Sequence, residues 1–335
     1  MTRLTLTDDG TALGVVLTGT GTDPDVELVR YVYRPTDVQL ESPRPYFHPV
    51  RTVTGDLVSL FRPHDHVWHK GIAWSLPNVG PHNFWGGPTF VAGEGYVQLD
   101  NDGSMVHEDF TALVGPGEEG SAENGAGDRV DVTEALAWVT QAGERVVDES
   151  RSFTVGLADE PGSWVLTFTS TLTNVSGADL PIGSPTTNGR ENAGYGGLFW
   201  RGPRSFTGGT ILAPDFAGGE EIRGQRAPWM GFTGTHDETA RDSTIVMVDD
   251  PENPRGPSSP GQDPEWFARN EWFACVCAAP FFSEEIPFAP GETLTFRYAV
   301  VVSDGGADPV RGEALAGAGR ARLGEVAARG GSTPA

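Results

Sequence analysis

Apolar and polar residues alternate along most of the regular stretches of this chain. In residues 164–174, Trp164 and Leu166 fall on one side of an extended segment, while threonines dominate the other side. A period of two is typical of an antiparallel strand with one buried and one solvated face. Residues 135–155 show the same pattern on both sides of 141–144, which predicts a hairpin.

Similar alternation predicts several more strands, and only one segment has the pattern of a helix. Residues 308–328 combine Asp308 as an N-cap, Pro309 in the first turn and a run of Ala, Leu, Arg and Glu. The sequence therefore predicts a mainly β protein with a C-terminal helix. The other predicted strands are 27–35, 243–250, 271–279 and 293–305.

Two long segments interrupt the alternation. Residues 115–128 form an acidic loop, and the proline-rich run 249–264 cannot be a central strand. The 45 glycines and 26 prolines are typical of an all-β protein with long connections. Because no break in composition marks a boundary, we expect a single domain over residues 1–329. Its predicted fold is a large antiparallel β-sandwich with a C-terminal helix, followed by a disordered tail at 330–335.

The formal net charge of −23 limits the classes of partner. A surface this negative repels nucleic acid and anionic lipid. No apolar run approaches the roughly 18–20 residues of a membrane span, and the N-terminus lacks the apolar segment of a signal peptide. We therefore expect a cytoplasmic protein with a small-molecule ligand. Cys275 and Cys277 are expected to be buried free thiols, since strand neighbours two apart pair poorly.

Histidines concentrate in one short region. Five of the seven fall within 35 positions, and the stretch "HDHVWHKG" (64–71) contains three of them. His64, His66 and His69 could bind a divalent metal ion such as zinc. Two imidazoles, with Asp65 orienting one of them, could instead transfer a proton near neutral pH. A third interpretation is that they are ordinary loop residues.

Aromatic, amide and basic residues accompany this cluster. Lys70, the only lysine, supplies a fixed positive charge for a carboxylate or a developing oxyanion. Asn83 and Trp85 suit the hydroxyls and the C–H faces of a sugar ring. The segment 186–206 places arginines among glycines, and 224–238 repeats the mixture of basic and aromatic residues. This combination favours a carbohydrate ligand.

The run "RPYFHPVRTVTGD…DHVWHKGIAWSLPNVGPHNFW" resembles a soluble bacterial family labelled "methane oxygenase PmoA", a domain of unknown function. Stretches such as "GGLFWRGP" and "EWFARNEWFA" agree more loosely. The family's motif histidines map to His66 and His69, Trp68 replaces the middle histidine, and Lys70 replaces the usual arginine. The label does not fit a chain without hydrophobic spans. More distantly, the family is similar to galactose-mutarotase-like supersandwich proteins, which implies work on carbohydrate.

These observations lead to the hypothesis of a carbohydrate-active enzyme without a cofactor, acting on a sugar or keto-sugar by elimination, epimerisation or hydrolysis. His66 and His69 would be catalytic. Glu191 is the first choice as partner base, and Glu149 and Glu271 are alternatives to it. Two alternatives stay open: a metal-dependent hydrolase or oxygenase using His64, His66 and His69, and a non-catalytic sugar-binding subunit of a sugar oxidoreductase. A homo-oligomer is also open. The residues expected to bind substrate are Asp65, Lys70, Asn83, Trp85, Arg190, Arg201, Arg226, Trp229 and His236.

Overall fold

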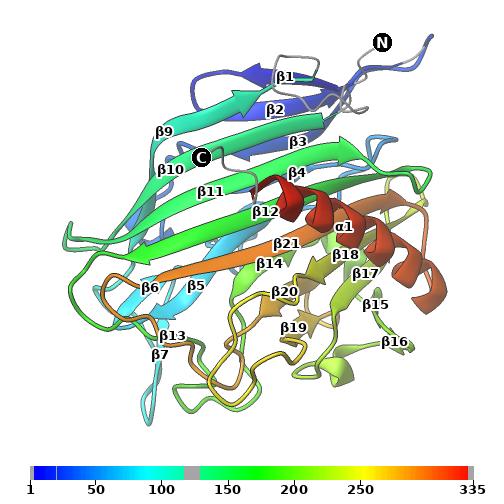
Figure 1. Ribbon diagram of the computed structural model, residues 1–335. Helices are drawn as coiled ribbons and strands as arrows, with labels where there is room; N and C mark the ends of the chain where they lie inside the picture. The colour runs from blue at the N-terminus through cyan, green and yellow to red at the C-terminus, as the bar shows by residue number, and fades with distance from the viewer. Residues whose placement is uncertain (1–3, 20, 117–128, 331–335) are drawn as a thin grey trace.

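The computed structural model describes residues 4–19, 21–116 and 129–330, and its main feature is a pair of large antiparallel sheets (Figure 1). The predicted all-β sandwich is thereby confirmed. Most of the predicted acidic loop and the tail after residue 330 lie outside the described residues. The first sheet runs β1 (Leu4–Asp8), β2 (Ala12–Leu17), β3 (Val26–Val32), β4 (Tyr46–Val50), β5 (Ile72–Val79), β14 (Gly197–Arg201), β20 (Cys275–Ala279) and β19 (Glu265–Arg269), with β6 (His82–Phe84) and β13 (Ile182–Gly183) also paired to β5.

The second sheet and the remaining elements complete the fold. The predicted hairpin is confirmed as β10 and β11. Of the proline-rich run 249–264, only Asp249 belongs to a strand, as the last residue of β18. The second sheet runs β16 (Phe216–Gly218), β15 (Thr210–Ala213), β17 (Trp229–Thr235), β18 (Asp242–Asp249), β21 (Thr293–Asp304), β12 (Ser163–Asn174), β11 (Arg145–Leu157), β10 (Arg129–Val139) and β9 (Ser104–Val114). The small hairpin is β7 (Thr89–Val91) and β8 (Gly95–Val97), the short 3₁₀ turns are η1 (Gln39–Glu41), η2 (Arg204–Phe206) and η3 (Glu220–Ile222), and the helix is α1 (Pro309–Gly330).

The two sheets enclose one large hydrophobic core. Trp74 of β5 lies between the sheets, with its ring 6.0 Å from that of Phe168 in β12 and 5.1 Å from that of Phe296 in β21. Alternate residues of each strand turn inward, as the period of two predicts. The core is therefore built by the same alternation that identifies the strands.

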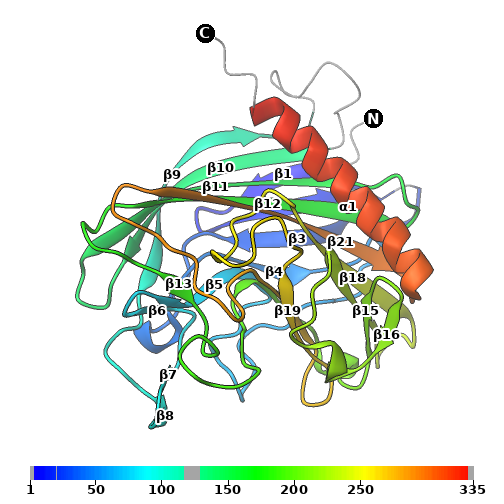
Figure 2. The ribbon, with the colours of Figure 1, turned by 60° about the horizontal axis from the view of Figure 1, so that its bottom comes forward.

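Helix α1 confirms the predicted C-terminal helix and covers the outer face of the second sheet (Figure 2). The carboxylate of Asp308 accepts the backbone N–H of Arg311 at 2.9 Å, which is the predicted N-cap. Leu315 of the helix shares a buried cluster with Val165, and Thr167 is buried as well. The prediction of a solvated threonine face was therefore wrong for the start of β12. Among the described residues, no helix is both long and apolar enough to cross a membrane.

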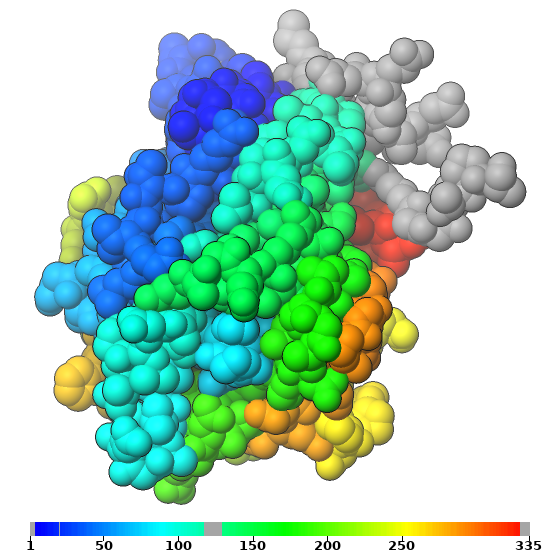
Figure 3. Space-filling view, turned by 90° about the vertical axis from the view of Figure 1, so that its left-hand side faces the viewer, coloured from blue at the N-terminus to red at the C-terminus, as the bar shows by residue number. Residues whose placement is uncertain are grey.

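One end of the sandwich is closed where the N-terminal strands meet β9 and β10 (Figure 3). Tyr31 packs its ring 4.7 Å from that of Phe153 and hydrogen-bonds the buried carboxylate of Glu134. Glu149 pairs with Arg151 at 2.9 Å in the same buried region. Charges at this end are thus paired inside the protein, which leaves Glu149 no access to a ligand.

Candidate active site

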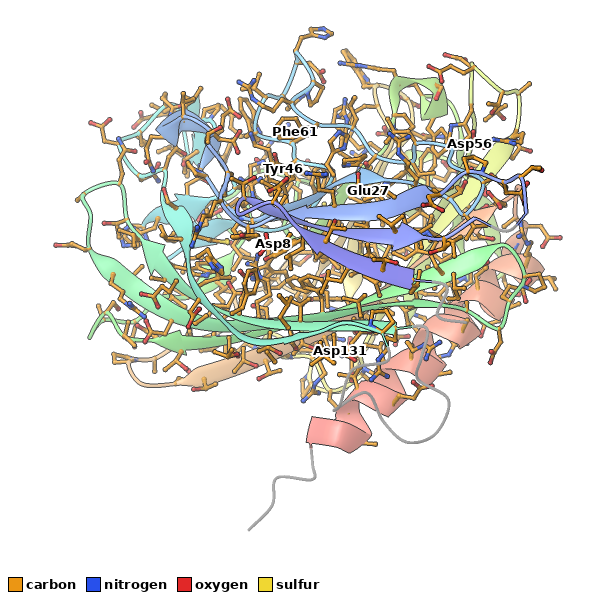
Figure 4. The ribbon with its side chains drawn as sticks, turned by 90° about the horizontal axis from the view of Figure 1, so that it is seen from above. Asp8, Glu27, Tyr46, Asp56, Phe61 and Asp131 are labelled. Carbon is orange, nitrogen blue, oxygen red and sulfur yellow. The ribbon has the colours of Figure 1, made fainter. Side chains whose placement is uncertain are left out.

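Residues 61–70, called the histidine loop below, are attached to the outer face of the first sheet. The N–H of Leu60 donates to the carbonyl of Arg201 at 2.9 Å, and the N–H of Arg201 donates to the carbonyl of Gly71 at 2.7 Å. Both ends of this loop, at Leu60 and Gly71, are therefore hydrogen-bonded to the last residue of β14. Tyr46 and Phe61 stack with ring centroids 4.9 Å apart and support the start of the loop (Figure 4).

Two turns inside this loop bring His66 and His69 together. The N–H of His66 donates to the carbonyl of Pro63, and the N–H of His69 donates to the carbonyl of His66, both at 3.0 Å. The two imidazoles stack with centroids 4.7 Å apart and an interplanar angle of 13°. The sequence prediction that these two rings share one wall agrees with this geometry.

Both histidines line a cavity of about 360 Å³, at the lower end of the range of roughly 300–1,000 Å³ that is typical of small-molecule sites. Its walls come from the outer faces of β14, β19 and β20, the histidine loop and the segments around residues 85–96 and 190–195. Aromatic rings make up much of this wall. The lining residues are His66, Trp68, His69, Trp85, Gly86, Pro88, Tyr96, Arg190, Asn192, Ala193, Tyr195, Phe199, Arg223, Phe267, Arg269, Phe273 and Cys275.

Asp65 holds His66 in one orientation. Its carboxylate lies 2.8 Å from Nδ1 of His66, and it also contacts the guanidinium groups of Arg201 and Arg204. Burial opposes ionisation of Asp65, but the hydrogen bond from His66 and the two arginines lower its pKa to about 2. A carboxylate at Nδ1 fixes the tautomer of His66 with the proton on Nδ1. The Nε2 atom then carries the lone pair.

His69 is held neutral in the opposite tautomer. Burial lowers its pKa well below the ordinary value, and the nearby charges of His66 and Arg201 lower it further. Nη1 of Arg201 lies 3.4 Å from Nδ1 of His69, and a guanidinium can only donate. Nδ1 therefore accepts, and the remaining proton of the ring sits on Nε2. The two stacked imidazoles thus have complementary roles available, one as an acceptor and one as a donor.

The aromatic wall depends on a turn that Asn83 organises. Its side-chain oxygen accepts the backbone N–H groups of Trp85 and Gly86 at 2.8 and 2.9 Å. Gly87 has a φ of +70°, and a Cβ there would lie 2.8 Å from the ring of Trp68. Asn83 is buried and does not line the cavity, so it positions Trp85, a lining residue, instead of contacting a ligand.

We expect Gly87→Ala to disturb the aromatic wall, although it leaves both histidine side chains in the chain unchanged. The substitution forces a side chain into a left-handed backbone conformation and against the indole of Trp68, which costs about 1–3 kcal/mol of folding free energy. Urea unfolding measures the loss. Gly93→Ala is the matched control for backbone strain, since its φ is +82° and nothing lies within 4 Å of a Cβ there. An equal loss in both variants would show that the contact with Trp68 is unimportant.

Several predicted site residues lie away from the cavity. Arg201 is buried directly behind His69, and Asp65 lies beside His66. Glu191 is exposed and absent from the lining, although its neighbours on both sides line the cavity. The structure therefore does not place Glu191 as the partner of the histidines, a position that Asp65 occupies instead.

Lys70 points away from the histidines into the protein. Its ammonium group is fully buried between the carboxylates of Asp37, at 2.9 Å, and Glu41. Successive residues of an extended segment face opposite sides, so His69 on the cavity side puts Lys70 on the other side. Lys70 therefore does not line the cavity, contrary to its predicted role in binding a substrate.

The predicted substrate-binding residues of the segment 224–238 are dispersed, and they contact both sheets. Trp229 is buried under α1 and donates to the carboxylate of Glu313. Arg226 lies 3.7 Å from a carboxylate oxygen of Glu265, outside the cavity. His236 hydrogen-bonds a serine hydroxyl of β18. None of these three predicted substrate-binding residues lines the cavity.

The alternative set of metal ligands does not converge on one point. The lone pairs of an imidazole lie in the ring plane, so the stacked rings of His66 and His69 cannot both aim at one ion about 2 Å away. His64 is exposed, and its Nδ1 lies 3.3 Å from Arg204. No group of three or more His, Cys, Asp or Glu residues that could hold a metal ion occurs in the described part of the chain.

Sequence reasoning missed several residues of the wall. Arg269 and Phe273 lie in the run "EWFARNEWFA", and Arg223 comes from the end of η3. Tyr96 reaches the cavity from the β7–β8 hairpin. Alternation in the strand Glu265–Arg269 could have separated Phe267, on the outer face, from the core residues beside it. The loop residues have no comparable signal, because tertiary contacts alone bring them together.

A family model described as "Family of unknown function (DUF6807)" matches residues 22–317, which is most of the chain. The chain belongs to this family. The description of DUF6807 states no activity and gives no support to the methane-oxygenase label. No curated protein sequence matches the chain.

Two solved structures resemble this DUF6807 chain weakly. A GH36 α-galactosidase, AgaA from Geobacillus stearothermophilus, solved with raffinose, is 12% identical with a TM-score of 0.38, over 90% of this chain and 40% of the other. A "Putative kojibiose phosphorylase from human microbiome" is 8% identical with a TM-score of 0.33, over 97% of this chain and 36% of the other. This chain thus spans well under half of either protein, and likeness at this level carries no statement about its activity.

Proposed function

We propose that the protein is an enzyme that transfers a proton to or from a carbon atom of a sugar or keto-sugar bound in the cavity. The observation that carries this proposal is the pair of stacked imidazoles at one wall of the cavity, with a carboxylate at Nδ1 of His66 and a guanidinium at Nδ1 of His69. Elimination, epimerisation and hydrolysis of an oxidised sugar can all begin with such a step.

His66 acts as the base in this proposal. The N–H at Nδ1 of His66 donates a hydrogen bond to the carboxylate of Asp65. Nε2 is therefore free to accept a proton from a C–H bond next to a carbonyl group. The electron pair of that bond moves to the carbonyl oxygen and gives an enolate. Asp65 remains ionised and stabilises the imidazolium that forms. Return of a proton from the His66 imidazolium to the same carbon restores the sugar, and the proton exchanges with solvent while it is on His66.

His69 acts as the electrophile. A neutral imidazole with its proton on Nε2 can donate a hydrogen bond to the developing enolate oxygen. Arg201, which donates to the other ring nitrogen, keeps His69 in this tautomer. The low pKa of His69, caused first by burial, prevents it from competing with His66 for the proton. This division of roles favours enolisation over simple binding.

The wall of the cavity supports a sugar-like ligand. Trp85 and Tyr195 have ring centroids 4.8 Å apart, and the ring of Trp68 lies 5.5 Å from that of His66. Flat rings pack on the C–H faces of a sugar, while Asn192 and the tyrosine hydroxyls can bond its hydroxyl groups. A cavity of about 360 Å³ suits one monosaccharide unit.

Exchange of sugar C–H protons with heavy water tests the proposal. The protein is incubated in D₂O with a panel of aldoses, 3-keto-sugars, uronates and aldonates, and loss of proton signals is followed by NMR. We expect catalysed exchange at a carbon next to a carbonyl or carboxyl group in at least one member. Saturable binding without exchange in any member would support the non-catalytic sugar-binding alternative and contradict the enzyme.

The pH dependence of exchange follows from the state of His66. Burial lowers its pKa, and the neighbouring carboxylate of Asp65 raises it, with a net decrease below the ordinary 6.5. The base must be neutral, so kcat/KM should fall as the pH drops through this lowered pKa and stay level above it. Asp65→Asn removes the raising influence, and we expect the acid limb to move to lower pH. A limb that moves upward would contradict the assignment of Asp65 and His66.

A further inference from the structure

The charge of the cavity is opposite to that of the protein. Acidic residues outnumber basic ones by 46 to 23 in the whole chain. The cavity nevertheless has three arginines in its lining, Arg190, Arg223 and Arg269, and no Asp or Glu among its described lining residues. A wall that followed the overall composition would carry more carboxylates than guanidinium groups. A cavity wall of this charge suits a ligand that carries negative charge.

The carboxylates behind the wall do not neutralise these arginines. Glu220 is shared by Arg223 and Arg269, with Nε of Arg269 3.2 Å from its Oε1. In the same way, Asp65 is shared by Arg201 and Arg204. Each cluster therefore has two guanidinium groups for one carboxylate. Each of the two clusters therefore has a net positive charge, and both lie close to the cavity in which a ligand would bind.

Arg190 has no carboxylate partner among the described residues. Its guanidinium lies 4.7 Å from the ring centroid of Tyr96 and hydrogen-bonds the Tyr96 hydroxyl. That hydroxyl is 3.0 Å from the hydroxyl of Tyr195, which also lines the cavity. Tyrosine contacts orient the guanidinium and leave its charge uncompensated. A planar guanidinium in this state is suited to bind a carboxylate through two parallel hydrogen bonds.

We propose that the cavity selects a sugar acid, and that Arg190 binds the carboxylate of this substrate. The inference rests on the proposed function and adds the substrate class to it. A carboxylate fits better than a phosphate, because it also acidifies the C–H bond beside it. Pairing with a guanidinium increases this acidity, since it neutralises charge that builds up on the carboxylate when His66 removes the proton. A phosphate would supply charge alone.

Titration calorimetry on the full chain tests the substrate class. The probes are D-glucuronate, D-galacturonate and D-mannuronate, each compared with its parent hexose and with the hexose 6-phosphate. We expect at least one uronate to bind about tenfold or more tightly than its parent hexose, with an affinity that falls as NaCl increases. The proposal is overturned if a hexose binds as tightly as its uronate, if the 6-phosphate binds best, or if no uronate binds.

Arg190→Gln, with Arg34→Gln as its matched control, identifies the binding group. Arg34 is also exposed and also lies over a tyrosine ring, at 5.4 Å from the centroid of Tyr33, but it is not among the residues that line the cavity. Both substitutions remove one positive charge from the protein. We expect the uronate affinity to fall about tenfold or more in the Arg190 variant and to be unchanged in the Arg34 variant. Equal effects would overturn the role of Arg190.

The two proposals fail in different ways. Uronate binding that depends on Arg190, without any exchange of C–H protons, would leave the substrate class in place and remove the proposed catalysis. Exchange that is confined to neutral keto-sugars, with no preference for uronates, would leave the catalysis in place and remove the substrate class.

Discussion

His66→Gln should abolish catalysed exchange of the substrate C–H proton. Glutamine keeps a polar side chain of similar reach but has no lone pair that is basic near neutral pH. We expect kcat to fall by about 10²–10⁴-fold, the usual contribution of a general base, with little change in ligand affinity. The measurement combines NMR exchange rates in D₂O with calorimetric affinities for the same probe. The structural cost should be small, because His66 is partly exposed on a loop.

His64→Gln is the matched control. It makes the same change two residues earlier in the same loop, at an exposed histidine outside the cavity lining. Exchange should stay close to the wild-type rate in this variant. Activity that survives in His66→Gln would refute the catalytic assignment. Activity lost equally in both variants would show that the loop as a whole, and not the base, had been disturbed.

The strands, the helix and its cap could be predicted from the sequence because their signals are local. The alternation in β12 and the Asp308 cap each depend on residues within a few positions of one another. The covering of β12 by α1 could not be predicted in this way. Val165 and Leu315 lie 150 residues apart in the chain, and only the folded chain brings them into one cluster.

The candidate site was predictable where one short loop supplies it. His66 and His69 are three residues apart, and tight turns suffice to place their rings on one wall. Lys70 follows His69 directly in the sequence, and the same reasoning wrongly placed it in the site. Adjacent residues of an extended segment face opposite sides, so Lys70 points away from the cavity. Arg223 and Arg269 were missed for the opposite reason. They join the cavity from distant segments, and no local pattern distinguishes them from other surface arginines.

Lys70→Met should strongly destabilise the protein without removing any group from the cavity. The ammonium of Lys70 is fully buried between Asp37 and Glu41, and its loss leaves two carboxylates with one fewer cation. Arg62 still contacts Glu41, whereas one oxygen of Asp37 already has no hydrogen-bond partner. Breaking a buried pair on one side costs about 3–5 kcal/mol, so we expect a loss of that size in urea unfolding at pH 7.

The pH dependence of this loss separates a buried ion pair from a simple packing defect. In the wild type, burial opposes ionisation of Glu41, but the hydrogen bonds from Arg62 and Lys70 lower its pKa. A carboxyl with a lowered pKa in the folded state stabilises the protein above its unfolded pKa of roughly 4.3, and this stabilisation is lost as the pH falls. The cost of Lys70→Met should therefore shrink as the pH falls towards 4 and Glu41 takes up a proton. Arg145→Gln, which breaks an exposed pair with Glu108, should cost less than about 1 kcal/mol. A Lys70 variant that is as stable as the wild type but no longer binds any uronate would contradict this structural role and would show that Lys70 binds the substrate.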